Sequence, residues 1–329
     1  MSEGKARGRV PWTPIWGALL AAGMIAGHTA GSAARPAVRF AYVTNQGSET
    51  VSVVDLATLK VASEIKVPGH PAGIALSPDG AHAYVTAPDA HDIAVIDTAT
   101  NAIVRRIPIG GGPLGIAVNP ASGLVYVADW YSRRLIVVDP QAARITNEIE
   151  VGQSPSGIAV TPDGGMILTA DRDSDTVTLI DAAAGKRLAT IPVGGHPFGI
   201  TLSADGTRAY TANVTSDTVS VIDIAAHAVV ASVAVGRRPY AVALSPTRAF
   251  VTDQYGGTVS VIDLASLKKI AAVDAGDHPE GIGYDAATGQ VYVAIWFDNQ
   301  LVRLDAQTLK VTGRAPVGDG PRAFGDFLR

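Results

Sequence analysis

A unit of about 42 residues recurs seven times and fills the chain after its first 34 residues. Each unit has a proline two residues before the Gly or Ala that opens an apolar run, and an aspartate that closes a Val-Ile-Asp-like run. The prolines are Pro71, Pro113, Pro155, Pro197, Pro239, Pro279 and Pro321. The aspartates are Asp55, Asp97, Asp139, Asp181, Asp223, Asp263 and Asp305. Both series are spaced by 42, 42, 42, 42, 40 and 42 residues, so we expect seven equivalent structural units that pack against one another.

The sequence of every unit predicts four short antiparallel strands. In the unit of Pro71 the β-branched content, the alternation and the turn spacing predict strands over residues 74–76, 83–86, 93–96 and 103–105. No long helical period interrupts this pattern. Units of about 40–50 residues with four strands are typical of β-propellers. We therefore predict an all-β fold, a seven-bladed β-propeller of four-stranded blades.

The two ends of the repeat complement each other. Asp55 has no repeat proline before it, and Pro321 has no closing aspartate after it. We therefore expect the segment around Phe324 to give the inner strand of the blade that begins at Phe40. Pairing of the N- and C-terminal strands in one blade closes the ring and leaves no free sheet edge between the first and last blades. The entropy cost of such a closure grows only logarithmically with loop length.

Three segments carry a resemblance to a known family. Residues 42–45 read Tyr-Val-Thr-Asn, residues 218–223 read Thr-Val-Ser-Val-Ile-Asp, and residues 194–200 read Gly-Gly-His-Pro-Phe-Gly-Ile. In these motifs the chain resembles the YVTN-repeat β-propellers, which implies seven blades over the whole mature chain. Members of that family are mostly exported bacterial or archaeal proteins of unsettled role. Similar seven-bladed propellers include lactone hydrolases, a metal-dependent lyase and domains of quinone- or haem-linked dehydrogenases, and fold alone does not choose among them.

The first 34 residues are predicted to be a cleavable signal peptide, followed by the propeller over residues 35–329. Lys5, Arg7 and Arg9 precede an apolar run over 15–26, which is short for a membrane span, and small residues at 32–34 suit cleavage after Ala34. An uncleaved anchor is the alternative. The sequence thus predicts a periplasmic or secreted protein whose mature part has no membrane span.

Composition excludes several classes of function. The chain has no cysteine, which rules out disulfides, thiolate metal sites and CxxCH haem attachment. Its formal charge is −4, and its Lys and Arg residues form no cluster, so we expect no nucleic-acid partner.

The strand order predicts which face of the ring carries function. Turns between strands 1–2 and 3–4 of every unit lie on one face and are similar in all units, which is typical of scaffold. The seven repeat aspartates on that face are predicted to accept backbone hydrogen bonds in turns. Loops between strands 2–3, and those between blades, lie on the other face, and there the units differ. Residues beside the repeat prolines should ring the mouth of the central channel.

Aromatic, arginine and histidine residues gather on that second face. We number the sectors by their prolines, with Pro71 in sector one. The predicted ligand-binding residues, mostly in sectors four to six, are Trp130, Tyr131, His196, Phe198, Arg237, Arg238, Tyr240, Tyr255, Trp296, Phe297 and Arg322. Apolar area combined with a few oriented polar groups is typical of binding sites, so we predict a site for a small molecule or a partner protein. Simple packing of the aromatic residues between loops is the alternative.

Two chemical hypotheses use histidines of this face. His70, His196 and His278 occupy equivalent places in a nearly trigonal layout, which suits a divalent metal; plain loop histidines are the alternative. His278 and Glu280 flank Pro279 and suit acid–base catalysis. Resemblance to the propeller lactonases then implies a lactonase-like hydrolase or lyase. The metal ligands of those enzymes, however, cannot be matched residue by residue to this sequence. A third class is an accessory protein of a periplasmic quinone- or haem-linked dehydrogenase, and the sequence leaves open whether the protein is an enzyme.

A run of alternating carboxylates over residues 171–175 resembles the start of a calcium-binding loop. The sixth place holds Thr176 instead of glycine, and the twelfth holds Ala182 instead of glutamate. A solvated loop is therefore favoured over a calcium site.

Overall fold

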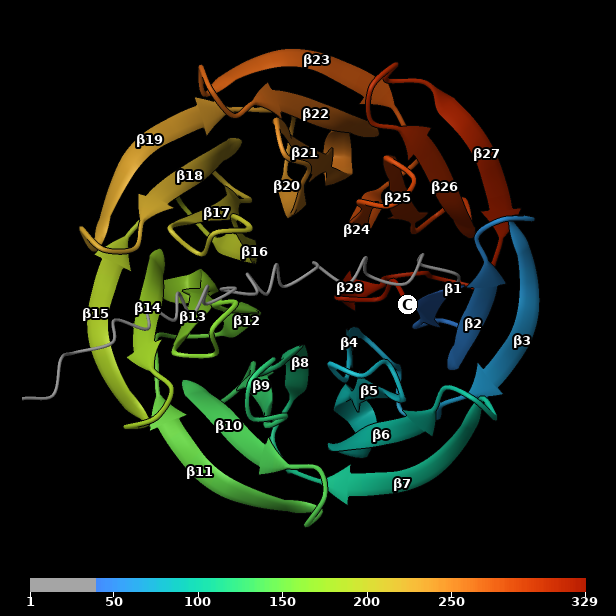
Figure 1. Cartoon of the computed structure of the whole chain (residues 1–329), viewed down its shortest axis with the longest axis vertical. Helices are drawn as coiled ribbons and strands as arrows, with labels where there is room; N and C mark the ends of the chain where they lie inside the picture. Colours follow the sequence, from blue (N-terminus) through green and yellow to red (C-terminus); the bar gives the residue numbers. More distant parts are fainter. Residues whose placement is uncertain (1–39) are drawn as a thin grey trace, which may run out of the picture. The chain divides into compact units, whose positions relative to one another are not determined.

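Seven antiparallel sheets surround a central axis in the computed structural model, which describes residues 40–329 (Figure 1). The predicted signal peptide lies outside the described residues. In each sheet the strands follow one another outward from the axis, as the strand order of the repeat predicts. The seven-bladed propeller and its four-stranded blades are thus confirmed. We number blades 1–6 by the prolines Pro71 to Pro279 and name the seventh the closing blade.

The strand bounds follow the repeat closely. Blade 1 has β4 (Gly73–Leu76), β5 (His82–Ala87), β6 (Asp92–Asp97) and β7 (Ala102–Pro108); blade 2 has β8 (Pro113–Val118), β9 (Val125–Asp129), β10 (Arg134–Asp139) and β11 (Arg144–Glu150); blade 3 has β12 (Pro155–Val160), β13 (Met166–Asp171), β14 (Thr176–Asp181) and β15 (Lys186–Pro192). Blade 4 has β16 (Pro197–Leu202), β17 (Arg208–Asn213), β18 (Thr218–Asp223) and β19 (Ala228–Ala234); blade 5 has β20 (Pro239–Leu244), β21 (Arg248–Asp253), β22 (Thr258–Asp263) and β23 (Lys268–Asp274); blade 6 has β24 (Pro279–Asp285), β25 (Gln290–Ile295), β26 (Gln300–Asp305) and β27 (Val311–Pro316). The closing blade has β1 (Phe40–Asn45), β2 (Thr50–Asp55) and β3 (Lys60–Lys66), and β28 (Phe324–Gly325) lies beside the axis.

Helical structure in this part of the chain is limited to three single 3-10 turns. They are η1 (Pro88–Ala90), η2 (Arg172–Ser174) and η3 (Gln254–Gly256), each between strands 2 and 3 of its blade. No helix within residues 40–329 has the length and apolarity needed to cross a membrane.

The core lies between the blades. The second and third strands of each blade are buried along almost their whole length, because a neighbouring blade covers each face of the sheet. The outer strands are mostly exposed. Inner strands meet closely around the axis: a Cβ added to Gly115 would collide with the carbonyl oxygen of Ser156, and one on Gly157 with that of Phe198. The glycine two residues after the repeat proline is therefore required by blade-to-blade packing at these two positions.

The C-terminal segment closes the ring. Phe40 N donates to Arg329 O and Arg329 N donates to Phe40 O, both at 2.8 Å, and Arg322 N donates to Thr44 O at 2.8 Å. β28 also pairs in parallel with β4, through Phe324 and Gly73. Residues 320–329 thus supply the inner edge of the closing blade, which confirms the predicted pairing of the chain's two ends.

The repeat aspartates serve the turns between strands 3 and 4. In blade 1, Asp97 Oδ1 accepts hydrogen bonds from the backbone N–H of Ala99 at 3.1 Å and of Thr100 at 2.8 Å. Corresponding bonds occur at Asp55, Asp139, Asp181, Asp223, Asp263 and Asp305. The predicted scaffold role is confirmed at all seven positions. These bonds favour the ionised carboxylate and lower the pKa of Asp305 to about 2.

The last residue of the YVTN motif is structural. Asn45 ends strand 2 and is fully buried, and its Nδ2 donates to Thr50 Oγ1 at 3.0 Å and to Ser52 Oγ at 2.8 Å. Asn213 repeats these contacts in blade 4. Blade 3 has Asp171 at this place, where it accepts hydrogen bonds from Thr178 at 2.5 Å and Thr169 at 2.8 Å. Burial nevertheless raises the pKa of Asp171 to about 6.

We predict that Asp171→Asn makes the protein more stable above pH 6. The folded pKa of Asp171 exceeds its ordinary value of 3.8, so wild-type stability falls as pH rises from about 4 to about 6. A shift of roughly two units corresponds to about 3 kcal/mol at pH 7.5. Asparagine is neutral and is already used at this place by Asn45 and Asn213. Urea unfolding at pH 4.5 and 7.5 should show a variant-minus-wild-type difference that grows with pH; a difference independent of pH would contradict the assignment.

Candidate ligand-binding site

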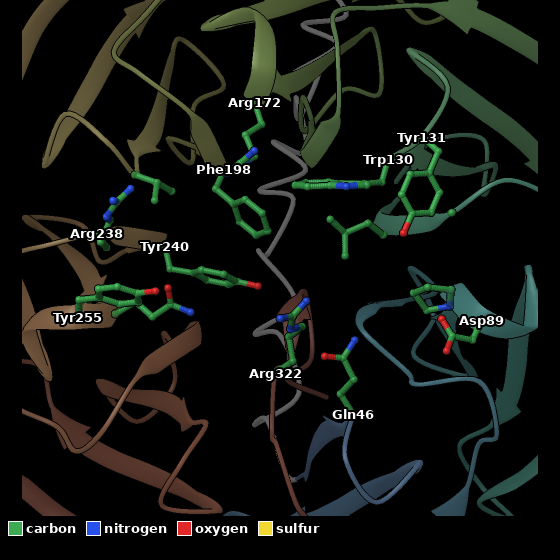
Figure 2. Close-up of a pocket in the computed structure, with 15 residues that line it drawn as sticks. Gln46, Asp89, Trp130, Tyr131, Arg172, Phe198, Arg238, Tyr240, Tyr255 and Arg322 are labelled. Atoms are coloured by element: carbon green, nitrogen blue, oxygen red, sulfur yellow. The ribbon is translucent and has the colours of Figure 1, made fainter.

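A pocket of about 570 Å³ opens at the channel mouth, on the face of the strand 2–3 and inter-blade loops (Figure 2). Blades 1–5 and the closing blade all contribute to it. Its lining consists of Gln46, Pro88, Asp89, Gly112, Leu114, Trp130, Tyr131, Arg172, Phe198, Val214, Arg238, Tyr240, Gln254, Tyr255 and Arg322. The pocket therefore lies on the face of the propeller that the sequence predicts to carry the binding site.

Backbone contacts between neighbouring blades hold the loops of the mouth. The residue before the repeat proline adopts a left-handed conformation in most blades, with φ of 52° at His196 and 53° at Arg238. The N–H of each is fixed by an aspartate in the strand 2–3 loop of the preceding blade. Asp175 Oδ1 accepts from His196 N at 2.7 Å, and Asp217 Oδ1 accepts from Arg238 N at 2.8 Å. These bonds set the positions from which the side chains of the mouth project.

Four aromatic rings gather around the axis beneath the mouth. The ring centroid of Phe198 lies 4.4 Å from that of Tyr240, 5.0 Å from that of Phe324 and 6.0 Å from that of Trp130. Such spacings are those of favourable aromatic pairs. Phe198 and Tyr240 are buried and still line the pocket, so they both pack and form its floor.

Three arginines each lie over an aromatic ring near the mouth. The Cζ atom of Arg172 is 5.5 Å from the centroid of Trp130, that of Arg238 is 5.8 Å from Tyr255, and that of Arg322 is 4.9 Å from Trp296. A guanidinium that stacks through its face keeps the N–H groups at its edge available for planar anions.

A buried ion pair lies on the axis. Glu280 is 2% exposed, and its Oε2 lies 3.0 Å from Nε of Arg322. Gln254 Nε2 donates to the other carboxylate oxygen of Glu280 at 2.7 Å. Burial raises the pKa of Glu280, while the charge of Arg322 and the hydrogen bonds oppose that rise. In Figure 2 the guanidinium of Arg322 points into the pocket beside the Tyr240 hydroxyl.

The Tyr240 hydroxyl lies close to the Glu280 carboxylate but lacks a well-aligned hydrogen bond. Tyr240 is 5% exposed, and its hydroxyl makes no hydrogen bond of good geometry to any residue in the described part of the chain. Burial raises the pKa of Tyr240 well above its ordinary value, so the hydroxyl keeps its proton. A buried donor whose acceptor is poorly aligned is less stable than one with a full hydrogen bond, and a ligand oxygen or a water can supply that bond.

The structure brings seven of the predicted ligand-binding residues into one pocket. These are Trp130, Tyr131, Phe198, Arg238, Tyr240, Tyr255 and Arg322. The other four lie outside the lining: Trp296 stacks on Arg322, Phe297 packs against His278, and His196 and Arg237 do not face the pocket.

Several lining residues were not predicted, although a positional signal exists for them. The residue directly after strand 2 lines the pocket in six of the seven blades. These residues are Gln46, Pro88, Trp130, Arg172, Val214 and Gln254. Aligning the repeats at the end of strand 2 would have found Gln46 and Arg172, whose side chains are unremarkable in the sequence alone.

The three histidines of the metal hypothesis do not converge. His70 Nδ1 lies 2.9 Å from Asp89 Oδ2, His278 Nδ1 lies 2.7 Å from Asp277 Oδ1, and His196 Nδ1 is buried without a partner among residues 40–329. In that range no group of three or more His, Asp or Glu side chains is arranged to hold a metal ion. The hypothesis of a divalent metal therefore gains no geometric support.

The two residues of the acid–base hypothesis, His278 and Glu280, also lie in different surroundings. Glu280 pairs with Arg322 on the axis, whereas the ring of His278 lies at the rim between Tyr255, at 5.0 Å, and Phe297, at 4.6 Å. No hydrogen bond or ion pair joins the two within the described chain. The hypothesis of acid–base catalysis thus remains a prediction from sequence.

A family comparison agrees with the repeat. Residues 21–122 match the model of a family described as YNCE-like beta-propeller. The resemblance to repeat propellers is confirmed. No curated protein matches the chain significantly.

Solved structures show the same architecture in other proteins. A structure of Kuenenia stuttgartiensis hydrazine synthase aligns with a TM-score of 0.71 at 23% identity, covering 78% of this chain and 89% of that one. A functionally unknown protein from Desulfotomaculum acetoxidans DSM 771 aligns with a TM-score of 0.74 at 16% identity, covering 87% and 100%. Dihydro-heme d1 dehydrogenase NirN, in complex with DHE, aligns with a TM-score of 0.63 at 15% identity, covering 86% and 74%. At these identities the likeness establishes the fold alone.

We predict that Arg238→Gly leaves the free energy of unfolding within about 1 kcal/mol of wild type. The loss of the stacking on Tyr255 is offset by release of the left-handed strain, since glycine adopts this φ freely and Gly320 does so at the equivalent place. Chemical denaturation measures the change. As a control, Asp217→Ala removes the acceptor of Arg238 N and should cost about 1 kcal/mol. A loss above about 2 kcal/mol for Arg238→Gly would assign Arg238 to the scaffold instead of the site.

Proposed function

We propose that this protein is a binding module that takes a small molecule with a flat apolar part into the pocket at the channel mouth. The observation that carries the proposal is one pocket with an aromatic floor and three arginines stacked on aromatic rings. Its volume of about 570 Å³ falls within the range of small-molecule sites.

The shape of the pocket favours a small molecule over a partner protein. The floor residues Phe198 and Tyr240 are almost fully buried, so only a group that enters the channel reaches them. Tyr131 is 80% exposed and stands at the rim as a wall for such a group (Figure 2). Its ring lies directly against Gly112, where a Cβ would displace it.

The position and the unpaired charge of Arg238 also support a role in ligand binding. Arg238 occupies a strained backbone position and is exposed, and its guanidinium has no carboxylate partner among residues 40–329. Its contribution to folding is therefore small, whereas a charged donor at the rim of the pocket serves ligand capture.

We infer further that the protein works outside the cytoplasm, in the periplasm or after secretion. The support is the basic start, short apolar run and small-residue site of residues 1–34. N-terminal sequencing of the protein recovered from the extracytoplasmic fraction should begin at Arg35; recovery of the intact N-terminus with the membranes would contradict cleavage.

We predict that Tyr131→Ala weakens binding of the neutral probe 2-naphthamide by about five- to tenfold, because it removes one aromatic wall of the pocket. The protein's stability should not change, since the ring is mostly exposed. Titration by ligand-observed NMR measures the affinity.

The matched control for this variant is Phe297→Ala. Phe297 is also an exposed aromatic residue of a strand 2–3 loop, at 61%, but lies outside the pocket lining. Its removal should leave the affinity unchanged. Equal losses in both variants, or no binding to the wild type, would contradict the proposed site.

A further inference from the structure

We propose that the ligand carries a single carboxylate, which Tyr240 and Arg322 bind on the propeller axis while its flat ring lies along Trp130 and Phe198. This inference rests on the proposed function and narrows the ligand to an aromatic monocarboxylate. It is carried by a set of donors at the deepest part of the pocket that have no well-aligned protein acceptor.

The Tyr240 hydroxyl is the first of these donors. It is buried and lines the pocket, and within the described residues it makes no well-aligned hydrogen bond, although the Glu280 carboxylate lies close to it. In Figure 2 the hydroxyl points toward the centre of the pocket, beside Arg322. Because a phenol donates one hydrogen bond, it is satisfied by a single acceptor oxygen from a ligand.

Arg322 supplies the second donor, and its orientation is fixed. Glu280 Oε2 lies 3.0 Å from Nε, and the Cζ atom of the guanidinium lies 4.9 Å from the ring centroid of Trp296. Glu280 is the one polar partner of this side chain within residues 40–329. The remaining N–H groups therefore keep a set direction into the pocket, where their planar fork matches a carboxylate.

Gln46 brings a third donor from the closing blade. Its side chain lines the pocket and lies near Arg322 in Figure 2. Its side-chain amide has no hydrogen bond to the rest of the described chain, although its backbone N donates to Gly320 O at 2.9 Å. The side chains of Tyr240, Arg322 and Gln46 thus converge at the depth of the pocket, where the carboxylate of Glu280 already faces Tyr240 and Arg322.

The charges around the pocket favour one negative charge over two. Arg172 is already paired with Asp173 at 2.5 Å, and Asp89 with His70 at 2.9 Å. On the axis Arg322 shares its charge with Glu280, which leaves Arg238 at the rim as the arginine of the lining without a carboxylate partner among residues 40–329. A monocarboxylate adds one charge beside that pair, whereas a phosphate dianion would add two next to a buried carboxylate.

The aromatic surface accounts for the rest of the ligand. Trp130 and Phe198 flank the axial donors, with ring centroids 6.0 Å apart, and both line the pocket. A flat ring that lies along them covers apolar area, and its carboxylate then reaches Tyr240 and Arg322 without leaving the axis.

The experiment is a calorimetric titration of the mature protein with 2-naphthoate, its neutral isostere 2-naphthamide, and inorganic phosphate. In the wild type, naphthoate should bind at least about tenfold more tightly than the amide, because a hydrogen bond to an ionised group is stronger than one to a neutral group. Tyr240→Phe should weaken naphthoate binding about tenfold and weaken binding of the amide by a smaller factor, because the amide carbonyl accepts a weaker hydrogen bond. The melting temperature of this variant should stay the same or rise, since the change removes a hydroxyl without a well-aligned hydrogen bond.

The matched control is Tyr42→Phe. The Tyr42 hydroxyl is also buried but donates to Asn101 Oδ1 at 3.0 Å, on the opposite face of the ring. That variant should lower the melting temperature and leave naphthoate affinity unchanged.

The possible results separate this inference from the proposed function. Equal binding of naphthoate and naphthamide would overturn the carboxylate subsite and leave the small-molecule pocket standing. Phosphate binding that competes with naphthoate and is lost in Tyr240→Phe would replace the monocarboxylate by a phosphate ligand. Failure of every probe to bind would overturn the pocket itself.

Discussion

The backbone hydrogen bonds between residues 320–329 and β1 are the interaction on which the rest of the molecule depends. They close the ring, and they also bring Arg322 and Phe324 to the axis. Without that pairing the closing blade would lack its inner edge, Glu280 would lose its counter-ion, and the aromatic floor would lack one ring. The candidate site is therefore a property of the closed ring and of no single repeat.

The two faces of the ring differ in how completely their polar groups are satisfied. On the turn face, each repeat aspartate accepts the backbone N–H groups of its own turn, and the same local solution recurs seven times. The mouth instead holds a Tyr240 hydroxyl without a well-aligned hydrogen bond, next to the buried carboxylate of Glu280. Left-handed residues such as Leu59 and Ala143 also occur in the turns, so the mouth is distinguished by its buried polar groups, which are the pattern expected of a functional site.

The sequence was sufficient for the fold because propeller topology follows from repeat spacing. Fixed distances between prolines and aspartates set the strand lengths, and the incomplete units at the two ends required ring closure. The site was predictable only in part. Position in the repeat placed Tyr240 and Arg238 at the mouth, but the direction of a side chain depends on neighbours from other blades. The equivalent repeat positions of His70, His196 and His278 said nothing about the reach of their side chains toward the axis. Glu280 was predicted to act with His278 in acid–base catalysis, and its pairing with Arg322 could not be foreseen because Arg322 comes 42 residues later, from the segment that closes the ring.

The crystal structure of the mature protein soaked with 2-naphthoate tests the central claim most directly. The account predicts that the carboxylate lies within hydrogen-bond distance of the Tyr240 hydroxyl and the Arg322 guanidinium, with the naphthalene ring against Trp130 and Phe198. A ring bound elsewhere on the propeller, or one seated in the pocket with its carboxylate turned to solvent, would contradict it.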